Sequence, residues 1–330
     1  MNGRRRGQAV WIGFVGALLL GLGFGSPAAG LERVRMGDLP LISNAPIFIA
    51  VEKGYFREAG IDLELPPFAS AARMIPALST GELEVAGGSI SAGLYNAVAD
   101  GMDFKIVADK GQTRPGYGYG PILVVRKDLV DSGQVKGPKD LVGRKVSQFA
   151  KGVSQDWFLA RLLEQHGISP GTVDRVYLAA PSAHKALAGR AIDAALTSEP
   201  WGARAEAEGI GVLLLTTDRG IERMQSAVIM YSGRFIRERR PTARAWMQAY
   251  LRGIRFYNEQ GPKGAEVVAI VEKHTKVPAR IIRASVPFYL SNDGRIYLET
   301  LTELQEFFLR QGWVKKRVPV EQMVDLSFLE

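Results

Sequence analysis

The stretch that decides the fold is Leu41–Pro67, which reads LISNAPIFIAVEKGYFREAGIDLELPP. Ser43 and Asn44 are candidate N-cap residues, and Pro46 stands where the first helical turn accepts a residue without an N–H group. Apolar residues at helical spacing follow, and Gly60 lies where a left-handed residue would end the helix. The stretch therefore predicts one helix that runs from a capped start to Gly60.

Strands are expected on both sides of this helix. Arg33–Met36 leads into it, and Ile61–Leu65 alternates apolar and acidic residues before a pair of prolines. The loop Leu39–Ala45 would then lie at the carboxyl end of a strand and over a helix N-terminus. Open α/β sheets bind their ligands at such a place.

The same stretch resembles a known family. The pattern N-A-P-x-x-x-A-x-E-K-G-Y-F-x-x-x-G-I-D-x-E, read from Asn44 to Glu64, is similar to the start of the SsuA-like group, the sulfonate-, taurine-, nitrate- and pyrimidine-binding proteins of bacterial ABC importers. The resemblance implies the type II periplasmic binding-protein fold, in which two α/β lobes joined by a hinge close on a ligand. The alternative is an ordinary βαβ start in some other α/β protein.

Helix and strand signals alternate along the chain, which favours an α/β class with mostly parallel sheets. Two stretches repeat the order strand, loop, helix, strand, helix, strand, and a glycine-rich segment near residue 120 suits a crossing between them. We expect residues 31–120 and 228–330 to form lobe I, with a helical C-terminal part, and residues 121–227 to form lobe II.

The first thirty residues have the layout of a secretory signal peptide. Arg4-Arg5-Arg6 precedes the uncharged stretch Ala9–Phe24, and the small residues that follow place the cleavage after Ala28 or Gly30. A retained anchor is the alternative, although a membrane helix needs about 20 apolar residues. The chain has no cysteine and so no site for a lipoprotein's anchor. These features predict a periplasmic protein.

The formal net charge of +8 is spread along the chain, apart from the clusters Arg237–Arg240 and Lys315–Arg317. Such clusters are typical of solvated faces, and no RNA- or DNA-binding motif accompanies them, so nucleic acid is not an expected partner. A mild positive excess suits anionic ligands.

Candidate ligand-binding residues of lobe I lie on loops that follow expected strands: Ser43, Asn44, Phe68, Ser70, Gly88 and Ser89. The N–H groups and the amide at residues 43–45 would bind an anionic or amide-bearing group. Phe68 would stack on a planar ligand, and the glycine would let the backbone approach closely. Helix capping, core packing and a tight turn are the alternative roles.

The other candidates are Tyr117, Gly152, Ser154, Glu199 and Trp201. Tyr117, with Tyr119, would lie at the crossing between the lobes. Lys151–Ser154 resembles the family's K-G-S-S/T turn, whose N–H groups and hydroxyls hold an oxyanion, but Val153 replaces the first hydroxyl and disfavours a sulfonate clamp.

Ser198–Trp201 resembles the family's D/E-P turn at a cleft-facing strand end. Glu199 would accept a hydrogen bond from an amine or ring N–H group, and Trp201 would form an aromatic wall. The alternative is a first-turn helix acid with its tryptophan in the core.

Catalytic signatures are absent from the sequence. The three histidines are scattered, and no nucleophile elbow, P-loop, zinc motif or dinucleotide fingerprint occurs. We expect no catalytic residue, cofactor or metal. The expected function is that of a monomeric periplasmic solute-binding protein that captures a sulfonate, nitrate, pyrimidine or aromatic molecule and delivers it to an ABC permease with its ATPase. The alternatives are an exported lyase- or dehydratase-like enzyme that uses Glu199 and His184, and a ligand-sensing subunit of a membrane receptor.

Overall fold

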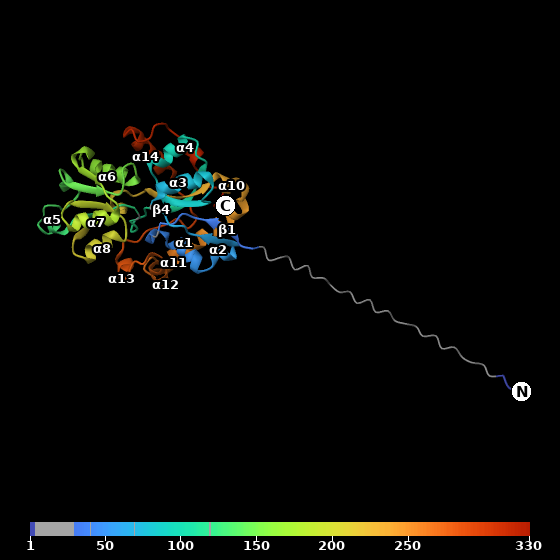
Figure 1. The fold of residues 1–330 in the computed structure, drawn as a ribbon. Coiled ribbons are helices and arrows are strands. Elements are labelled where there is room, and N and C mark those ends of the chain that lie inside the picture. The colour runs from blue at the N-terminus through green and yellow to red at the C-terminus, as the bar shows by residue number, and fades with distance from the viewer. Residues whose placement is uncertain (4–29, 40, 69, 119) are drawn as a thin grey trace. The chain divides into compact units, whose positions relative to one another are not determined.

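Two β-sheets organise the chain from Leu31 to Glu330 (Figure 1). The computed structural model describes residues 1–3, 30–39, 41–68, 70–118 and 120–330. The predicted signal peptide lies almost wholly outside these residues. No helix of the described part is long and apolar enough to cross a membrane.

The first sheet is made of a two-stranded part, β2-β1, and a three-stranded part, β3-β10-β4, which lie edge to edge at β1 and β3. Its strands are β1 (Glu32–Arg35), β2 (Ile61–Glu64), β3 (Val85–Ser89), β4 (Phe104–Gln112) and β10 (Gln225–Ser232). β1 and β2 pair in parallel, and a parallel bridge from Met36 to Val85 joins them to β3. β10 lies between β3 and β4 and runs antiparallel to both. The carboxyl ends of β1 to β4 therefore meet at one edge of the sheet.

The second sheet has the strand order β7-β6-β8-β5-β9. Its strands are β5 (Ile122–Arg126), β6 (Lys145–Gln148), β7 (Asp174–Tyr177), β8 (Ala194–Thr197) and β9 (Gly211–Leu215). β5 runs antiparallel to β8 and β9, whereas β6 is parallel to β7 and β8. In each sheet four strands run in one direction, as the expectation of mostly parallel sheets requires, and one strand is reversed. The reversed strands are β10 and β5, because each enters its sheet from the other one.

Helices cover both faces of the first sheet (Figure 1). On one face lie α1 (Ala45–Glu52), α2 (Tyr55–Glu58), α11 (Arg240–Gln260) and α12 (Ala265–Thr275), and on the other α3 (Ala71–Thr80), α4 (Ala92–Ala99) and α14 (Leu298–Arg310). Side chains of β10 alternate between the two cores: Ile229 and Tyr231 join the first group, and Val228 and Met230 the second. The strand is buried on both faces, which explains its continuous apolar run.

The second sheet is covered in the same way. α6 (Ser154–Gln165) packs on one face with Leu123 and Val125, and α7 (Ala180–Ala188) and α8 (Trp201–Ala207) on the other with Ile122 and Val124. The core around α6 continues into the core around α3 and α14. The remaining elements are η1 (Ile42–Asn44), α5 (Lys127–Asp131), η2 (Pro138–Leu141), η3 (Pro170–Thr172), α9 (Thr217–Gly220), α10 (Gly233–Glu238), α13 (Ala279–Ala284) and α15 (Val320–Met323).

The single helix expected up to Gly60 is two helices. α1 ends at Glu52 and α2 begins at Tyr55, because Gly54 between them has a left-handed φ of 75°. Glycine adopts this conformation without the steric cost that a Cβ atom imposes. The break lets the apolar residues of both short helices face the same core.

Two segments connect the sheets, one between β4 and β5 and one between β9 and β10, and hydrogen bonds tie them together. Thr113 N donates to Met224 O (2.9 Å), Met224 N to Thr113 Oγ1 (2.7 Å), and Thr113 Oγ1 to Glu222 O (3.0 Å). Gly116 N also donates to Asp218 Oδ2 (3.0 Å). The predicted lobe boundaries fall in or near these segments, and the assignment of whole lobes stays a prediction.

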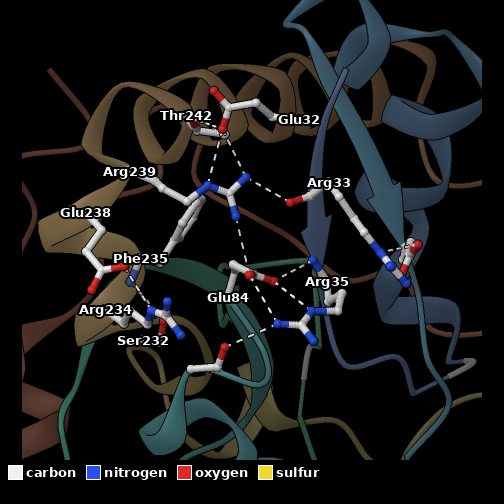
Figure 2. A network of polar contacts seen from close by, with 12 residues as sticks. Glu32, Arg33, Arg35, Glu84, Ser232, Arg234, Phe235, Glu238, Arg239 and Thr242 are labelled. Atoms are coloured by element: carbon white, nitrogen blue, oxygen red, sulfur yellow. Dashed lines mark hydrogen bonds and ion pairs between the residues drawn. The ribbon is translucent and has the colours of Figure 1, made fainter. Parts of the chain in front are cut away.

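Figure 2 shows a network of polar contacts that fixes β1 against α11. Arg239 donates to Glu32 Oε2 (3.0 Å) and to Glu84 Oε1 (3.4 Å), and Glu84 also binds Arg35. Glu32 Oε2 accepts a further bond from Thr242 Oγ1 (2.6 Å), and the bonds from Thr242 and Arg239 lower the pKa of Glu32. The network holds β1, and with it the loop that follows β1, in place beneath α11.

Replacing Gly253 by alanine tests the close crossing of α1 and α11. A Cβ atom on Gly253 would lie 2.2 Å from the carbonyl oxygen of Pro46, so α1 has to move away. We expect G253A to lower the free energy of unfolding by about 1–3 kcal/mol in urea titrations. The control is G93A, at an exposed helical glycine whose nearest neighbouring atom is 3.6 Å away. G93A should be neutral or slightly stabilising, and equal losses in both variants would contradict the crossing.

Candidate functional site

Asn44 lies at the carboxyl edge of the first sheet, directly before α1. It occupies the N-cap position, but its side chain does not cap the helix. Its Nδ2 atom donates to Asp38 Oδ1 (2.7 Å) and to Leu39 O (2.6 Å) instead. The predicted capping role is wrong because acceptors on the loop after β1 hold the amide. Asn44 Oδ1 is buried and has no hydrogen-bond partner among the described residues.

Lys110 on β4 reaches the same loop, and the sequence analysis missed it. The residue is 3% exposed, and its stem crosses Gly87 so closely that a Cβ atom there would lie 2.7 Å from Lys110 Cδ. Lys110 Nζ donates to Ser43 Oγ (3.5 Å). Burial lowers the pKa of Lys110 to about 8, against the opposing charges of Asp38 and Asp109. The signal that could have found it is the ionisable pair Asp109-Lys110, which directly follows the apolar run of β4.

Asp109, the neighbour of Lys110, is the centre of a buried network. Its Oδ1 accepts hydrogen bonds from Gly111 N (2.6 Å) and Gln225 Nε2 (2.7 Å), and its Oδ2 from Gln112 Nε2 (3.0 Å) and Ser291 N (2.8 Å). Burial raises the pKa of Asp109 to about 6, although these four donors pull it the other way. The carboxylate therefore ties β4 to β10 and to the segment before α14.

Buried polar side chains without partners mark the carboxyl edge of the second sheet. Among the described residues, Ser147 Oγ and both amide atoms of Gln148 at the end of β6 have no hydrogen-bond partner, nor has Thr197 Oγ1 at the end of β8. More than about 90% of buried polar groups in proteins are hydrogen-bonded. A cluster of exceptions at strand ends is what a polar ligand would satisfy. The sequence analysis did not single out these residues.

The structure brings the loop after β3 against the loop after β6. Three contacts join them: an antiparallel bridge between Ser91 and Val153, and hydrogen bonds from Ala92 N to Gly152 O (2.8 Å) and from Ser154 N to Ile90 O (3.1 Å). The predicted site residues Gly88 and Ser89 at the end of β3 are thereby placed near Gly152 and Ser154. Ser89 itself is exposed.

The N–H groups of the Lys151–Ser154 turn, which resembles an oxyanion-binding turn, already donate to acceptors within the protein. Gly152 N donates to Asp156 Oδ2 (2.7 Å), and Ser154 N donates across to the other loop. The buried carboxylate of Asp156 thus lies where the resemblance places an anionic ligand, and burial raises its pKa. These two N–H groups cannot serve an oxyanion in this arrangement.

Phe68, Ser70 and Gly88 lie together beside α3. Phe68 is half-buried and packs on the core of that helix, as the core-packing alternative has it. Ser70 is the N-cap residue of α3 but makes no side-chain cap bond. Gly88 is a strand residue and no tight turn, and a Cβ atom on it would lie 2.2 Å from Ala71 Cβ. Its role here is the close packing of α3 on β3.

Glu199 uses both carboxylate oxygens within the protein. Oε2 accepts from Ala203 N (3.0 Å) in α8, and Oε1 accepts from Val286 N (2.8 Å) after α13. Burial raises the pKa of Glu199. The side chain is therefore a helix-terminal acid that also holds a neighbouring segment, as the alternative reading has it, and no acceptor atom is left over.

Trp201 and His184 lie side by side, with ring centroids 5.3 Å apart, and line a small pocket together with Thr197. His184 Nε2 lies 2.8 Å from Glu208 Oε2. The acid–base pair considered for an enzyme, Glu199 with His184, is not formed, because each side chain has other partners.

Tyr117 lies on the segment between β4 and β5, with its ring 5.7 Å from that of Tyr289. Tyr119 falls outside the described residues. Within those residues no group of three or more histidine, aspartate or glutamate side chains is arranged to hold a metal ion.

Part of this chain is similar in sequence to proteins that have been named. It is 25% identical over 233 residues to a protein of Brachyspira hyodysenteriae named as a candidate ABC transporter periplasmic binding protein, covering 69% of this chain and 66% of that one. It is 25% identical over 201 residues to the bicarbonate-binding protein CmpA of Synechococcus elongatus, covering 55% and 44%. The chain thus spans less than two thirds of the length of either relative.

Solved structures share its fold. The ligand-binding component of an ABC-type import system from Staphylococcus aureus, with zinc bound, matches with a TM-score of 0.76 at 18% identity over 90% of this chain and 98% of that one. The aliphatic sulphonate-binding protein SsuA from Escherichia coli matches with a TM-score of 0.72 at 18% identity, covering 90% and 99%. The desulfurization enzyme DszB matches with a TM-score of 0.64 at 15% identity, covering 90% and 97%.

These matches confirm the expected α/β class and the periplasmic binding-protein fold. They do not separate binding from catalysis, since DszB has a related fold. The model of the NMT1-like family matches residues 28–272. The chain belongs to the NMT1-like family.

Proposed function

We propose that this chain is the solute-binding protein of an ABC importer, and that it binds a small organic or anionic molecule between the strand ends of its two sheets. One observation carries the proposal. Buried polar atoms that have no partner in the described part of the chain lie at the carboxyl edges of both sheets, at Asn44 in the first and at Ser147, Gln148 and Thr197 in the second. Open α/β sheets bind ligands at these edges.

The names of the relatives support transport over other uses of the fold. Both curated relatives are named as binding proteins, one for an ABC transporter and one for bicarbonate. The protein would work as a monomer in the periplasm, with lobes at residues 31–120 with 228–330 and at 121–227, and pass its solute to a permease with an ATPase. Catalysis has less support, because Glu199 and His184 do not form an acid–base pair.

Ligand capture would be coupled to closure of the two sheets. The bridge between Ser91 and Val153 forms only while the loops after β3 and β6 are in contact. A ligand that contacts both carboxyl edges stabilises this closed arrangement over an open one, and so shifts the population toward it. The permease would recognise the closed form.

A thermal-shift and calorimetric screen of the protein without its leader tests this function. The probes are nitrate, bicarbonate, ethanesulfonate, taurine, benzoate, benzamide and cytosine. A binder at a hundredfold excess over its Kd raises stability by about 2.7 kcal/mol. We expect Q148A to weaken the best binder about tenfold, because the amide of Gln148 loses its contact with the ligand.

The matched control is Q134A, at an exposed glutamine on the same lobe. It should bind like the wild type. Mass spectrometry of the incubated probes separates binding from turnover. Binding of no probe, an unchanged Kd in Q148A, or conversion of a probe into a product would each contradict the proposed function.

A further inference from the structure

We propose that Lys110 and Asn44 form the ligand-anchoring end of this site, and that they select a solute with a single anionic group next to an N–H or O–H donor. This inference rests on the proposed function and names the class of its ligand. Amino acids, hydroxy acids, taurine and bicarbonate all belong to this class.

The position of Lys110 is that of a ligand-binding cation. Its side chain leaves β4, crosses the strand β3 at Gly87 and ends at Ser43, on the loop before α1. An ammonium group has three N–H donors, and one long bond to Ser43 Oγ (3.5 Å) is its only hydrogen bond among the described residues. A buried ammonium group with unused donors is costly unless an anion completes its surroundings.

The two carboxylates near Lys110 do not neutralise its ammonium group by an ion pair. Asp109 lies next to it on β4 and is taken up by four N–H donors, and Asp38 on the loop after β1 accepts from the Asn44 amide. Neither forms an ion pair with Lys110 within the described part of the chain. The charge of His274 on α12 opposes the burial that raises the pKa of Asp38. The two nearby negative charges repel a dianion such as sulfate about twice as strongly as a monoanion, so Lys110 can retain a monoanion more readily.

Asn44 offers an acceptor for the N–H or O–H donor of the ligand. Its amide nitrogen is used by Asp38 and Leu39, so the unpartnered Oδ1 atom is left as an acceptor next to Ser43. An acceptor that is buried without a donor costs free energy, and a ligand that brings an N–H or O–H group removes this cost. The anchor thus offers an ammonium group at Ser43 and a carbonyl oxygen on the next residue, Asn44.

Affinity for such a ligand should fall in alkali. Burial lowers the pKa of Lys110 to about 8, and only the charged ammonium form attracts an anion. Above that pH the charged fraction falls tenfold per unit, so the apparent Kd should rise about tenfold per unit. Burial also raises the pKa values of Asp38 and of Asp109, the latter to about 6, so Asp109 titrates below this window.

Calorimetric titration with matched pairs of probes tests the inference: bicarbonate against nitrate, taurine against ethanesulfonate, and glycolate against acetate. The first member of each pair has a donor that the second lacks. We expect at least one first member to bind at least about tenfold more tightly than its partner, and K110M to weaken it by about tenfold to a hundredfold. The control is K105M, on the same strand, whose amine instead binds Gln322 O at the surface.

A second variant guards against misfolding of K110M. G87A keeps the charge but pushes the stem of Lys110 aside, and it should weaken the same probe while its circular dichroism stays unchanged. Equal binding by K110M and the wild type, equal binding of both members of every pair, or a Kd that is flat from pH 7 to pH 10 would overturn the inference. Binding of cytosine or benzamide alone would overturn it too but leave the proposed function standing, whereas binding of no probe contradicts both.

Discussion

Replacing Asp109 by alanine is expected to lower the free energy of unfolding by about 3–5 kcal/mol at neutral pH. The change removes the acceptor of four hydrogen bonds, from Gly111, Gln112, Gln225 and Ser291, in a place that water does not reach. Each donor then stays buried without a partner. Urea unfolding followed by circular dichroism measures the loss.

D128A is the matched control for this variant. Asp128 forms one ion pair with Arg126 (2.7 Å), and its side chain is 41% exposed. Exposed ion pairs contribute less than about 1 kcal/mol, so D128A should unfold close to the wild-type midpoint. Similar losses in the two variants would show that the network of Asp109 does not hold β4, β10 and the segment before α14 together.

Replacing Trp246 by alanine should cost a similar amount, about 3–5 kcal/mol, for a different reason. The side chain is fully buried on α11, and its ring lies 5.6 Å from that of Phe56, 5.7 Å from Tyr231 and 5.4 Å from Tyr250. Alanine leaves a cavity among aromatic rings that belong to three different elements, and these can collapse only in part. Differential scanning calorimetry should show a large drop in Tm.

W246F separates ring volume from polarity. Trp246 Nε1 is buried without a partner among the described residues, so phenylalanine removes an unsatisfied donor and keeps most of the aromatic body. We expect W246F to stay within about 1.5 kcal/mol of the wild type. If W246F were as unstable as W246A, the indole N–H group rather than its volume would be the important part.

The fold could largely be predicted from the sequence because local signals agree along most of the chain. Gly81 and Gly167, for example, follow α3 and α6 with left-handed φ values, and glycine after an apolar helical pattern is a typical signal of a helix end. The direction of β5 and β10 could not be predicted in the same way. Their pairing partners are far away in sequence, and an apolar strand that is buried on both faces reads alike in parallel and antiparallel sheets.

The candidate site was harder to predict, since burial and unsatisfied hydrogen bonds are properties of the folded chain. Loop residues such as Glu199 and Gly152 are conspicuous in the sequence, yet local structure uses up their polar atoms. Gln148 and Lys110 are strand residues whose polar atoms become isolated only when helices and neighbouring strands cover them. A lysine in a strand ordinarily reads as a sign of solvent exposure.

The hydroxyl of Thr113 joins the two connecting segments by bonding to Met224 N and to Glu222 O. If these bonds persist while the sheets part, the motion is a swing about an axis near Thr113 and not a sliding of one half past the other. Atoms close to this pivot hardly move, and atoms of either sheet move farther the farther they lie from Thr113. A solute would then enter on the side of the molecule that lies farthest from Thr113. The bonds of Thr113 would persist each time the sheets open and close.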